Sequence, residues 1–370
     1  MNILFVNWMD IKNPRAGGAE LYSWEICKRL VNDGNVVEFL TSTATELVNN
    51  EKMDEINITR IGNDFTLYPK AFFFILENLS RYDLIIEVIN GPPFLFPIKI
   101  PYSKHIVIIF HLPTFITVSK KLLLFGPSEF ILSRFLLYMF YRHRKVVTDG
   151  DNTKKELKKL GFTEIYVAED GLKSCDNDIS ELNHKDRIVV IMGPLKPWKR
   201  IDHGIIAFSI LPYPWKLFIL GKGDKTYIKK LKDMVIEMGL EQRVTFTGYV
   251  DEKTKASIIS KSMLAIITSE KEGFSLIALE CQQYGCVPVM YKFSGIEHSV
   301  IPSITSLVVP DGNIKDIQET LLKISSDEET LNRMSKRAKE FSKQFTWDNT
   351  YNKIKNVINH TKNLPTENLD

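Results

Sequence analysis

Two glutamates stand at the ends of an apolar run in KEGFSLIALE, residues 271–280. Glu272 follows a strand pattern over residues 262–268, so we expect it in a loop, where its carboxylate can accept hydrogen bonds from sugar hydroxyls. Glu280 lies inside the helix that we predict over residues 275–284. A carboxylate buried in such a helix is costly unless hydrogen-bond donors reach it.

Two kinds of donor can satisfy Glu280. Ribose hydroxyls at the edge of a ligand cleft are one, and the cation of a nearby lysine or arginine is the other. Spacing alone favours the salt bridge. The start of the same helix carries a second signal, because Ser275 is a plausible N-cap. The backbone N–H groups of Gly273, Phe274 and Ser275 would then point into the cleft.

A cluster of cations lies in GPLKPWKRID, residues 193–202, just after a predicted strand over residues 187–192. Lys196, Lys199 and Arg200 gather where the chain enters a helix. Cations beside a helix N-terminus suit a diphosphate, both by charge and by hydrogen bonding. A solvated basic turn explains the same pattern equally well.

A pair of glycines, Gly17 and Gly18, lies in PRAGGAE, residues 14–20, between a predicted strand and a predicted helix over residues 20–31. Adjacent glycines let the backbone approach a ligand closely, and the helix start attracts anions. This is not the dinucleotide fingerprint, and no acid follows at the ribose position. Taken alone, the pattern favours a simple turn over an active-site loop.

The elements that must position these residues alternate between short apolar strands and helices. Such βαβ order predicts an α/β fold with parallel, doubly wound sheets, which bind ligands at the carboxyl ends of their strands. We predict two Rossmann-like domains facing each other across a cleft, over residues 1–172 and 187–340. Residues 341–370 form a helical tail expected to pack back on the first domain.

Composition excludes several classes of protein. The chain has 370 residues and a net charge of +3, so no basic tail for nucleic acid is indicated. The four cysteines form no CxxC pair and are read as reduced thiols. The first residues predict a strand and not a signal peptide, and no apolar run reaches the ~18 residues that span a bilayer. We therefore expect a cytoplasmic protein without a nucleic-acid partner.

Taken together and in order, these motifs resemble those of the family 4 retaining glycosyltransferases of the GT-B fold. The resemblance covers nearly the whole chain. It is carried by GGAE within residues 7–25, GPLKPWKRID at 193–202, LGKGD at 220–224, VTFTGYV at 244–250 and EGFSLIALE at 272–280.

The resemblance implies a role for each matching residue. Gly17 and Gly18 would lie beside the donor diphosphate, which Lys199 would hold with Arg200 as its neighbour. Glu272 would bind hydroxyls of the donor sugar, and Glu280 would bind the ribose. The backbone of Gly273, Phe274 and Ser275 would complete the sugar and phosphate pocket.

His111 ends a strand predicted over residues 105–110. The family often has a histidine there, near the reacting sugar, so the resemblance places His111 with Glu272 and Lys199 among the catalytic residues. Without the family, a core or loop histidine is the simpler interpretation. One departure stands out: the glycine of the first donor motif is usually followed by arginine, whereas Gly193 is followed by Pro194. Lys196 or Arg200 would have to replace that cation.

The implied reaction is transfer of a hexose from a nucleotide diphosphate sugar to an acceptor hydroxyl on a glycan or a lipid-linked molecule, with retention at the anomeric carbon. The departing phosphate would help to deprotonate the acceptor, and neither a metal nor a cofactor is needed. Two alternatives stay open. One is a nucleotide-sugar epimerase of the same architecture, and the other is a non-catalytic protein that only binds a nucleotide sugar.

A hydrophobic stretch with basic ends covers residues 120–145. This pattern suits an interfacial helix at an anionic membrane, and equally a core helix packed on a sheet. The first interpretation predicts peripheral contact with the inner face of a membrane through this segment.

Overall fold

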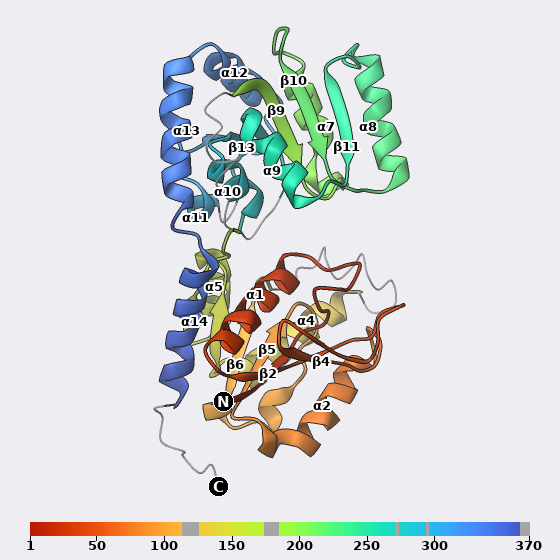
Figure 1. Cartoon of the computed structure of the whole chain (residues 1–370), viewed down its shortest axis with the longest axis vertical. Helices are drawn as coiled ribbons and strands as arrows, with labels where there is room; N and C mark the ends of the chain where they lie inside the picture. Colours follow the sequence, from red (N-terminus) through yellow and green to blue (C-terminus); the bar gives the residue numbers. More distant parts are fainter. Residues whose placement is uncertain (113–125, 174–184, 271–273, 294–295, 363–370) are drawn as a thin grey trace. The chain divides into compact units, whose positions relative to one another are not determined.

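The chain folds into two compact units in a computed structural model (Figure 1). Unit 1 comprises residues 1–171 and 347–370, and unit 2 comprises residues 172–346. The structure describes residues 1–112, 126–173, 185–270, 274–293 and 296–362. Of the tail predicted as residues 341–370, the first part completes a helix of unit 2, and the part from Trp347 onward belongs to unit 1.

Unit 1 is built on an eight-stranded sheet with the order β3-β4-β2-β1-β5-β6-β7-β8. All neighbouring pairs are parallel except β3 with β4. The central strands are buried on both faces, which explains their continuous apolar sequences. The strands are β1 (Asn2–Val6), β2 (Val36–Thr41), β3 (Asn50–Met53), β4 (Ile56–Arg60), β5 (Leu84–Ile89), β6 (His105–Ile109), β7 (Lys145–Thr148) and β8 (Ile165–Val167).

Helices cover this sheet. The C-terminal helix packs beside α1, where the rings of Tyr22 and Trp347 meet edge to face at 5.7 Å. Arg29 Nε donates to Asp348 at 2.7 Å across the same pair of helices. The helices are α1 (Gly18–Asn32), α2 (Leu67–Asn78), α4 (Gly126–Tyr141), α5 (Asp151–Lys159) and α14 (Trp347–Lys362).

Unit 2 is built on a six-stranded parallel sheet with the order β11-β10-β9-β12-β13-β14. Its strands are β9 (Asp186–Met192), β10 (Lys216–Leu220), β11 (Val244–Gly248), β12 (Ser262–Ile267), β13 (Val287–Tyr291) and β14 (Leu307–Val309). Its helices are α7 (Ile201–Phe208), α8 (Lys225–Glu237), α9 (Glu252–Lys261), α10 (Leu276–Gln283), α11 (Ile296–Ser299), α12 (Ile314–Ser325) and α13 (Glu328–Ser342).

The predicted strands and helices lie within a few residues of the observed ones, but the hairpin of β3 and β4 was missed. β3 has the sequence NEKM, which carries a single apolar residue, so it gives no strand signal. It is an edge strand, where pairing on one side only and a polar sequence are both tolerated. The hairpin contributes Arg60 at the end of β4 and thereby shapes the carboxyl edge of the sheet.

A buried network of charges joins this hairpin to the loop after β1. The Arg60 guanidinium is fully buried, and its Nε donates to Asp10 Oδ2 at 2.6 Å. Its Nη2 lies 2.6 Å from Glu51 Oε1, and its Nη1 donates to the carbonyl of Val48 at 2.6 Å. Bonds to Asp10 and Glu51 outweigh the effect of burial and raise the pKa of Arg60. Removing one partner of such a network leaves the other charged groups buried without a counter-charge.

We expect Arg60→Met to destabilise unit 1 by about 3–5 kcal/mol, because Asp10 would be left buried without its cation. Hydrogen exchange of the β3 and β4 amides reports this loss in unit 1 alone. The matched control is Arg15→Met, which breaks the partly exposed pair with Asp64 and should cost about 1 kcal/mol or less. Equal effects of the two substitutions would contradict a special role for the buried network.

Candidate functional site

The carboxyl edge of the sheet in unit 2 brings three predicted motifs together. The loops that follow β9 and β10 pack backbone against backbone, because Leu195 N donates to the carbonyl of Lys222 at 2.7 Å and Gly193 N donates to the carbonyl of Leu220 at 3.0 Å. The loop after β11 joins them where Gly221 N donates to the carbonyl of Gly248 at 2.8 Å. The edge is therefore a set of interlocked loops.

Glycine is required where these loops touch. Gly221 has φ +143°, and a Cβ there would lie 1.9 Å from the carbonyl oxygen of Gly193. At Gly223 a Cβ would lie 2.2 Å from the carbonyl oxygen of Leu195. Both obstacles are backbone atoms, which cannot rotate away. The glycines of LGKGD thus allow the loop after β10 to lie directly against GPLKPWKRID.

The turn that carries Lys199 and Arg200 is held to the end of β12. Pro197–Lys199 form a 3₁₀ turn, and Arg200 caps α7 with φ +46°. The hydroxyl of Thr268 donates to the carbonyls of both Lys199, at 2.9 Å, and Arg200, at 2.7 Å. The predicted cations therefore sit at a fixed place beside the end of β12.

Arg200 is engaged by acids in this structure. Its Nη1 donates to Asp311 Oδ1 at 2.7 Å, and its Nε lies 3.4 Å from Glu270 Oε1. Burial lowers the pKa of Arg200, but the bonds to these two carboxylates outweigh burial and raise it. A contact between Arg200 and a diphosphate stays a prediction; the guanidinium has five N–H donors, and these two contacts use Nη1 and Nε.

Two further lysines lie on exposed aromatic rings at this edge. Lys196 Nζ lies 4.8 Å from the centre of the Trp198 ring, and Lys222 Nζ lies 4.3 Å from the centre of the Tyr249 ring. Trp198 is 40% exposed and Tyr249 is 70% exposed. Lys222 and Tyr249 lie in the motifs LGKGD and VTFTGYV, but no role is predicted for either residue from the sequence. Each ring holds a cation at the edge where an anion would bind.

Glu280 is paired with a lysine. Its Oε1 accepts a hydrogen bond from Lys255 Nζ at 2.8 Å, and Lys255 also lies 3.1 Å from Glu252 Oε2. Burial raises the pKa of Glu280, and the nearby Lys255 ammonium opposes this shift. The salt-bridge alternative for Glu280 is confirmed, with Lys255 as the partner, whereas ribose binding stays a prediction.

The start of α10 has the expected cap. The Ser275 side chain is buried and accepts from the amide of Ala278 at 3.4 Å, as predicted for an N-cap. The Phe274 ring is also buried and lies 6.0 Å from the ring of Phe345. Glu272 and Gly273 lie outside the described residues, so their predicted roles stay predictions.

The remaining predicted residues belong to unit 1. Gly17 and Gly18 are exposed at the start of α1, two residues earlier than the predicted helix. Gly17 N donates to Glu20 Oε2 at 2.7 Å, so this amide is engaged in a cap of the helix itself. His111 is exposed just beyond β6, as expected for a residue at the carboxyl edge. The predicted site residues are thus divided between the two units.

Metal ligands do not gather within the described ranges. There, no group of three or more histidine, cysteine, aspartate or glutamate side chains is placed to hold a metal ion. Three cysteines, Cys27, Cys281 and Cys286, are buried and not in disulfides, while Cys175 lies outside the described residues. Metal independence stays a prediction for the reaction.

Comparison with known proteins bears on this edge of unit 2. Residues 175–341 match the family model described as "Glycosyl transferases group 1". The matched stretch contains all the loops of the edge just described. This part of the chain is therefore similar to the glycosyl transferases group 1. This agrees with the resemblance seen in the sequence at the level of a GT-B glycosyltransferase, although the match does not distinguish family 4.

Curated relatives align with part of the chain. An uncharacterised glycosyltransferase from Methanocaldococcus jannaschii is 26% identical over 159 residues, which is 43% of this chain and 44% of that protein. The poly(glycerol-phosphate) alpha-glucosyltransferase of Bacillus subtilis is 28% identical over 165 residues, 43% of this chain and 24% of that protein. The aligned stretch thus spans less than half the length of these relatives.

Solved structures resemble nearly the whole chain in fold. Sucrose-phosphate synthase from Thermosynechococcus elongatus has a TM-score of 0.80 at 17% identity and covers 97% of this chain and 98% of its own. HepE from Anabaena, in complex with UDP, has a TM-score of 0.78 at 18% identity. The alignment covers 97% of this chain and 100% of the HepE chain. The predicted fold class is confirmed: the chain has the GT-B fold, with two Rossmann-like units.

We expect Gly221→Ala to destabilise unit 2 by at least about 2 kcal/mol, because the new Cβ meets the backbone of Gly193 and the left-handed region is strained. The loop at Gly193 would also shift, which amide chemical shifts would reveal. Gly239→Ala is the matched control, since Gly239 has φ +65° but open space around it and should lose only about 1 kcal/mol. Similar losses for both variants would show that contact with Gly193 is unimportant.

Proposed function

We propose that this protein is a retaining glycosyltransferase of the family 4 type, which transfers a hexose from a nucleotide diphosphate sugar to a hydroxyl of a glycan or lipid-linked acceptor. One observation carries the proposal: the Lys199 turn is bonded to the end of β12, beside the capped start of α10, inside the region that matches the group 1 family. A lysine and a helix N-terminus at one edge suit a diphosphate.

The chemistry follows from this placement. Negative charge grows on the leaving diphosphate as the bond to the sugar breaks, and Lys199 with the first amides of α10 would stabilise that charge. Pro194 replaces an expected arginine, and Lys196, two residues later in the same loop, is a cation that can compensate. The departing phosphate would help to deprotonate the acceptor on the same face, with Glu272 on the sugar hydroxyls and His111 near the sugar. Neither metal nor cofactor is expected.

A donor carrying a nucleoside diphosphate is also supported by structural similarity. Structures of Anabaena HepE, which shares this fold, hold UDP and UDP-glucose. Relatives differ in what their names say they transfer, so the base and sugar used here require measurement. The epimerase and the non-catalytic binding protein remain the competing functions. An epimerase would isomerise the donor without an acceptor, whereas a binding protein would never release nucleotide from it.

Calorimetric titration with UDP, GDP and ADP tests the donor site and its base. We expect one nucleotide to bind, and Glu280→Ala to weaken it at least about tenfold, since a carboxylate that holds ribose hydroxyls contributes about 1.4 kcal/mol or more. The control is Glu252→Ala, which removes the other carboxylate partner of Lys255 and should change the affinity less than twofold.

Three outcomes would count against the proposed roles. If both variants weaken binding equally, Glu280 acts through Lys255 and not on the ribose. If neither does, the ribose assignment is wrong. If none of the three nucleotides binds, the result counts against the phosphate site and against an active transferase, and Pro194 is the departure that would explain it.

The acceptor side includes a surface suited to a membrane. On α4 the buried Leu137 and Tyr141 face the core, whereas the opposite face exposes apolar side chains. Arg142 stacks over Tyr138 at 4.6 Å, and α5 follows with lysines at its C-terminal end. The exposed apolar residues of α4 are Leu132, Phe135, Tyr138, Met139 and Phe140. Residues 120–125 lie outside the described residues. In the described part, the buried side chains agree with a core helix, and the exposed apolar side chains support the proposal of membrane contact.

Among the described helices, none is long and apolar enough to cross a membrane. The proposed location is therefore the inner face of the membrane, contacted peripherally through α4, where a lipid-linked acceptor would be reached. Apolar side chains beside cations bind anionic bilayers through both burial and charge.

We expect the protein to float with vesicles of phosphatidylglycerol and to stay in solution with vesicles of phosphatidylcholine alone. The double variant Phe135→Ser and Met139→Ser should lose at least about tenfold in binding, because two apolar side chains no longer enter the bilayer. Ile236→Ser with Leu322→Ser, two exposed apolar residues of unit 2, is the control. Unchanged flotation of the α4 variant would refute contact through this helix.

A further inference from the structure

A groove in unit 1 lies apart from the residues assigned so far. It runs between one side of α2 and the loops that follow β2 and β4, and it encloses about 680 Å³. This lies within the roughly 300–1,000 Å³ of small-molecule sites. The residues of α2 that line it, Lys70, Phe73, Phe74 and Glu77, are spaced to share one face of the helix.

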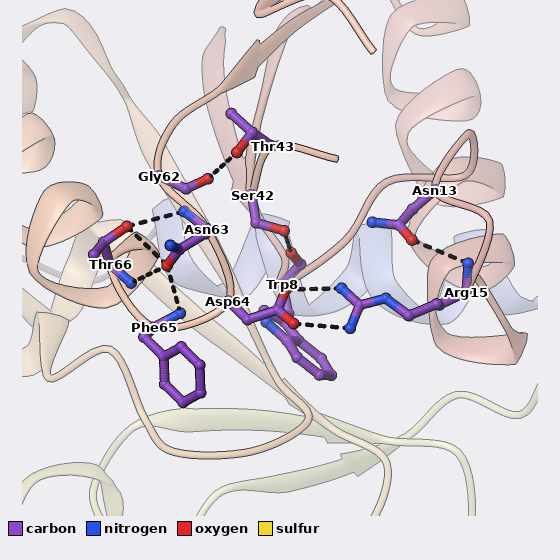
Figure 2. Close-up of polar contacts among 10 residues, drawn as sticks. All are labelled: Trp8, Asn13, Arg15, Ser42, Thr43, Gly62, Asn63, Asp64, Phe65 and Thr66. Atoms are coloured by element: carbon purple, nitrogen blue, oxygen red, sulfur yellow. Dashed lines mark hydrogen bonds and ion pairs between the residues drawn. The ribbon is translucent and has the colours of Figure 1, made fainter. Parts of the chain in front are cut away.

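One end of the groove has a rigid polar frame, which Figure 2 shows. Asn63 Oδ1 accepts three hydrogen bonds at 3.0 Å, from the amides of Phe65 and Thr66 and from the hydroxyl of Thr66. The carbonyl of Gly62 accepts from the amide of Thr43 at 2.7 Å. With its oxygen held in this way, the Asn63 side chain presents its Nδ2 in a fixed direction. That group donates to no other described residue.

The groove carries further hydrogen-bonding groups that are not engaged. The side chains of Asn49, Lys70 and Glu77 make no polar contact with any residue in the described part of the chain. Together with Asn63 they offer donors and acceptors on both sides of the same space. Groups of both kinds suit a ligand whose own polar groups donate and accept, as sugar hydroxyls do.

An aromatic surface accompanies these polar groups. Phe73 is 61% exposed although it lies in the groove, and Phe74 is half-buried beside it. An exposed ring beside hydrogen-bonding side chains matches the two faces of a sugar ring, which is apolar on its C–H face and polar at its rim. A purely apolar ligand would leave the amides unsatisfied, and such groups lose hydrogen bonds to water on binding.

The charges in the groove cancel. Arg60 lies at its wall, where the guanidinium is paired with Asp10 and Glu51, and Glu51 is also paired with Lys12, so these four charges balance. Lys70 and Glu77 carry opposite charges. The ligand best suited to this balance is therefore neutral, since a charged one would meet no excess of the opposite sign.

The groove shares its frame with the loop of Gly17. Arg15 reaches Asp64 with two hydrogen bonds, of 2.8 and 2.7 Å, and its guanidinium lies 5.4 Å from the centre of the Trp8 ring (Figure 2). The carbonyl of Trp8 in turn accepts from the hydroxyl of Ser42 at 2.7 Å. Segments at the carboxyl ends of β1, β2 and β4 are thus joined by these contacts.

We propose that this groove binds a neutral oligosaccharide portion of the acceptor, through the Phe73 ring and the side chains of Asn49, Asn63, Lys70 and Glu77. Its role in the reaction rests on the proposed glycosyl transfer, but binding of the saccharide does not. The groove would hold sugars distant from the reacting hydroxyl and so select the acceptor.

Saturation-transfer NMR on the full chain tests this with named probes. The neutral probes are maltotriose, cellotriose and chitotriose. Trigalacturonate represents an acidic glycan, and dihexanoyl phosphatidylglycerol, below its micellar concentration, represents a lipid. We expect a neutral trisaccharide to bind, and Phe73→Ala and Asn49→Ala each to weaken it at least tenfold. Ile236→Ala, which shortens an apolar side chain that is 59% exposed on α8 of unit 2, should leave binding unchanged.

Three results would overturn the inference: binding of the acidic or lipid probe alone, saccharide binding that the groove variants do not alter, and no binding by any probe. Glu77→Gln provides a further variant at an exposed position, so a folding defect at Phe73 would not obscure the answer. Nucleotide titration of the same samples separates the two proposals. Normal nucleotide affinity without saccharide binding rejects only the groove, whereas loss of nucleotide binding in the parent protein rejects the donor site.

Discussion

The approach of Gly221 to the carbonyl of Gly193 is the constraint on which the candidate donor site depends. Only a residue without a Cβ can occupy that position, since 1.9 Å separates the hypothetical atom from backbone oxygen. Once the loops after β9 and β10 lie in contact, the turn that carries Lys199 is directed toward the end of β12, where Thr268 bonds to it. The cations, the capped helix and the exposed aromatic rings then share one edge of the sheet.

Arg60 is the residue that fixes the positions of loops in unit 1. Its buried guanidinium joins the β3–β4 hairpin to Asp10 in the loop after β1. The same residue is among those that line the groove along α2. A buried ion pair is weak evidence of stability, because desolvation offsets its attraction. Its value here is geometric: it sets where the loop that leads to Gly17 lies relative to the groove.

Two charged residues expected to meet the donor, Arg200 and Glu280, are paired within the protein. Arg200 contacts Asp311 and Glu270, and Glu280 contacts Lys255. Partly exposed pairs of this kind contribute only about 0–1 kcal/mol, so a diphosphate or a ribose could replace one partner at small cost. The pairs also keep the side chains extended toward the edge before a ligand arrives. Donor binding would thus replace ion pairs within the protein by contacts to the ligand. The affinity for the donor should therefore depend on salt less than the number of cations suggests.

The sequence by itself determined the α/β class, most strands, the Ser275 cap and the salt bridge of Glu280 as a class of contact. These follow from local periodicity, capping chemistry and the cost of a buried carboxylate. Each of these depends on residues that are close together in the sequence. Only the tertiary structure decided that Lys255 is the partner, that Asp311 holds Arg200, and that β3 forms an edge strand. It also revealed the groove between α2 and the loops after β2 and β4. Such contacts join residues far apart in the chain, so they depend on packing of whole elements, which no local pattern encodes.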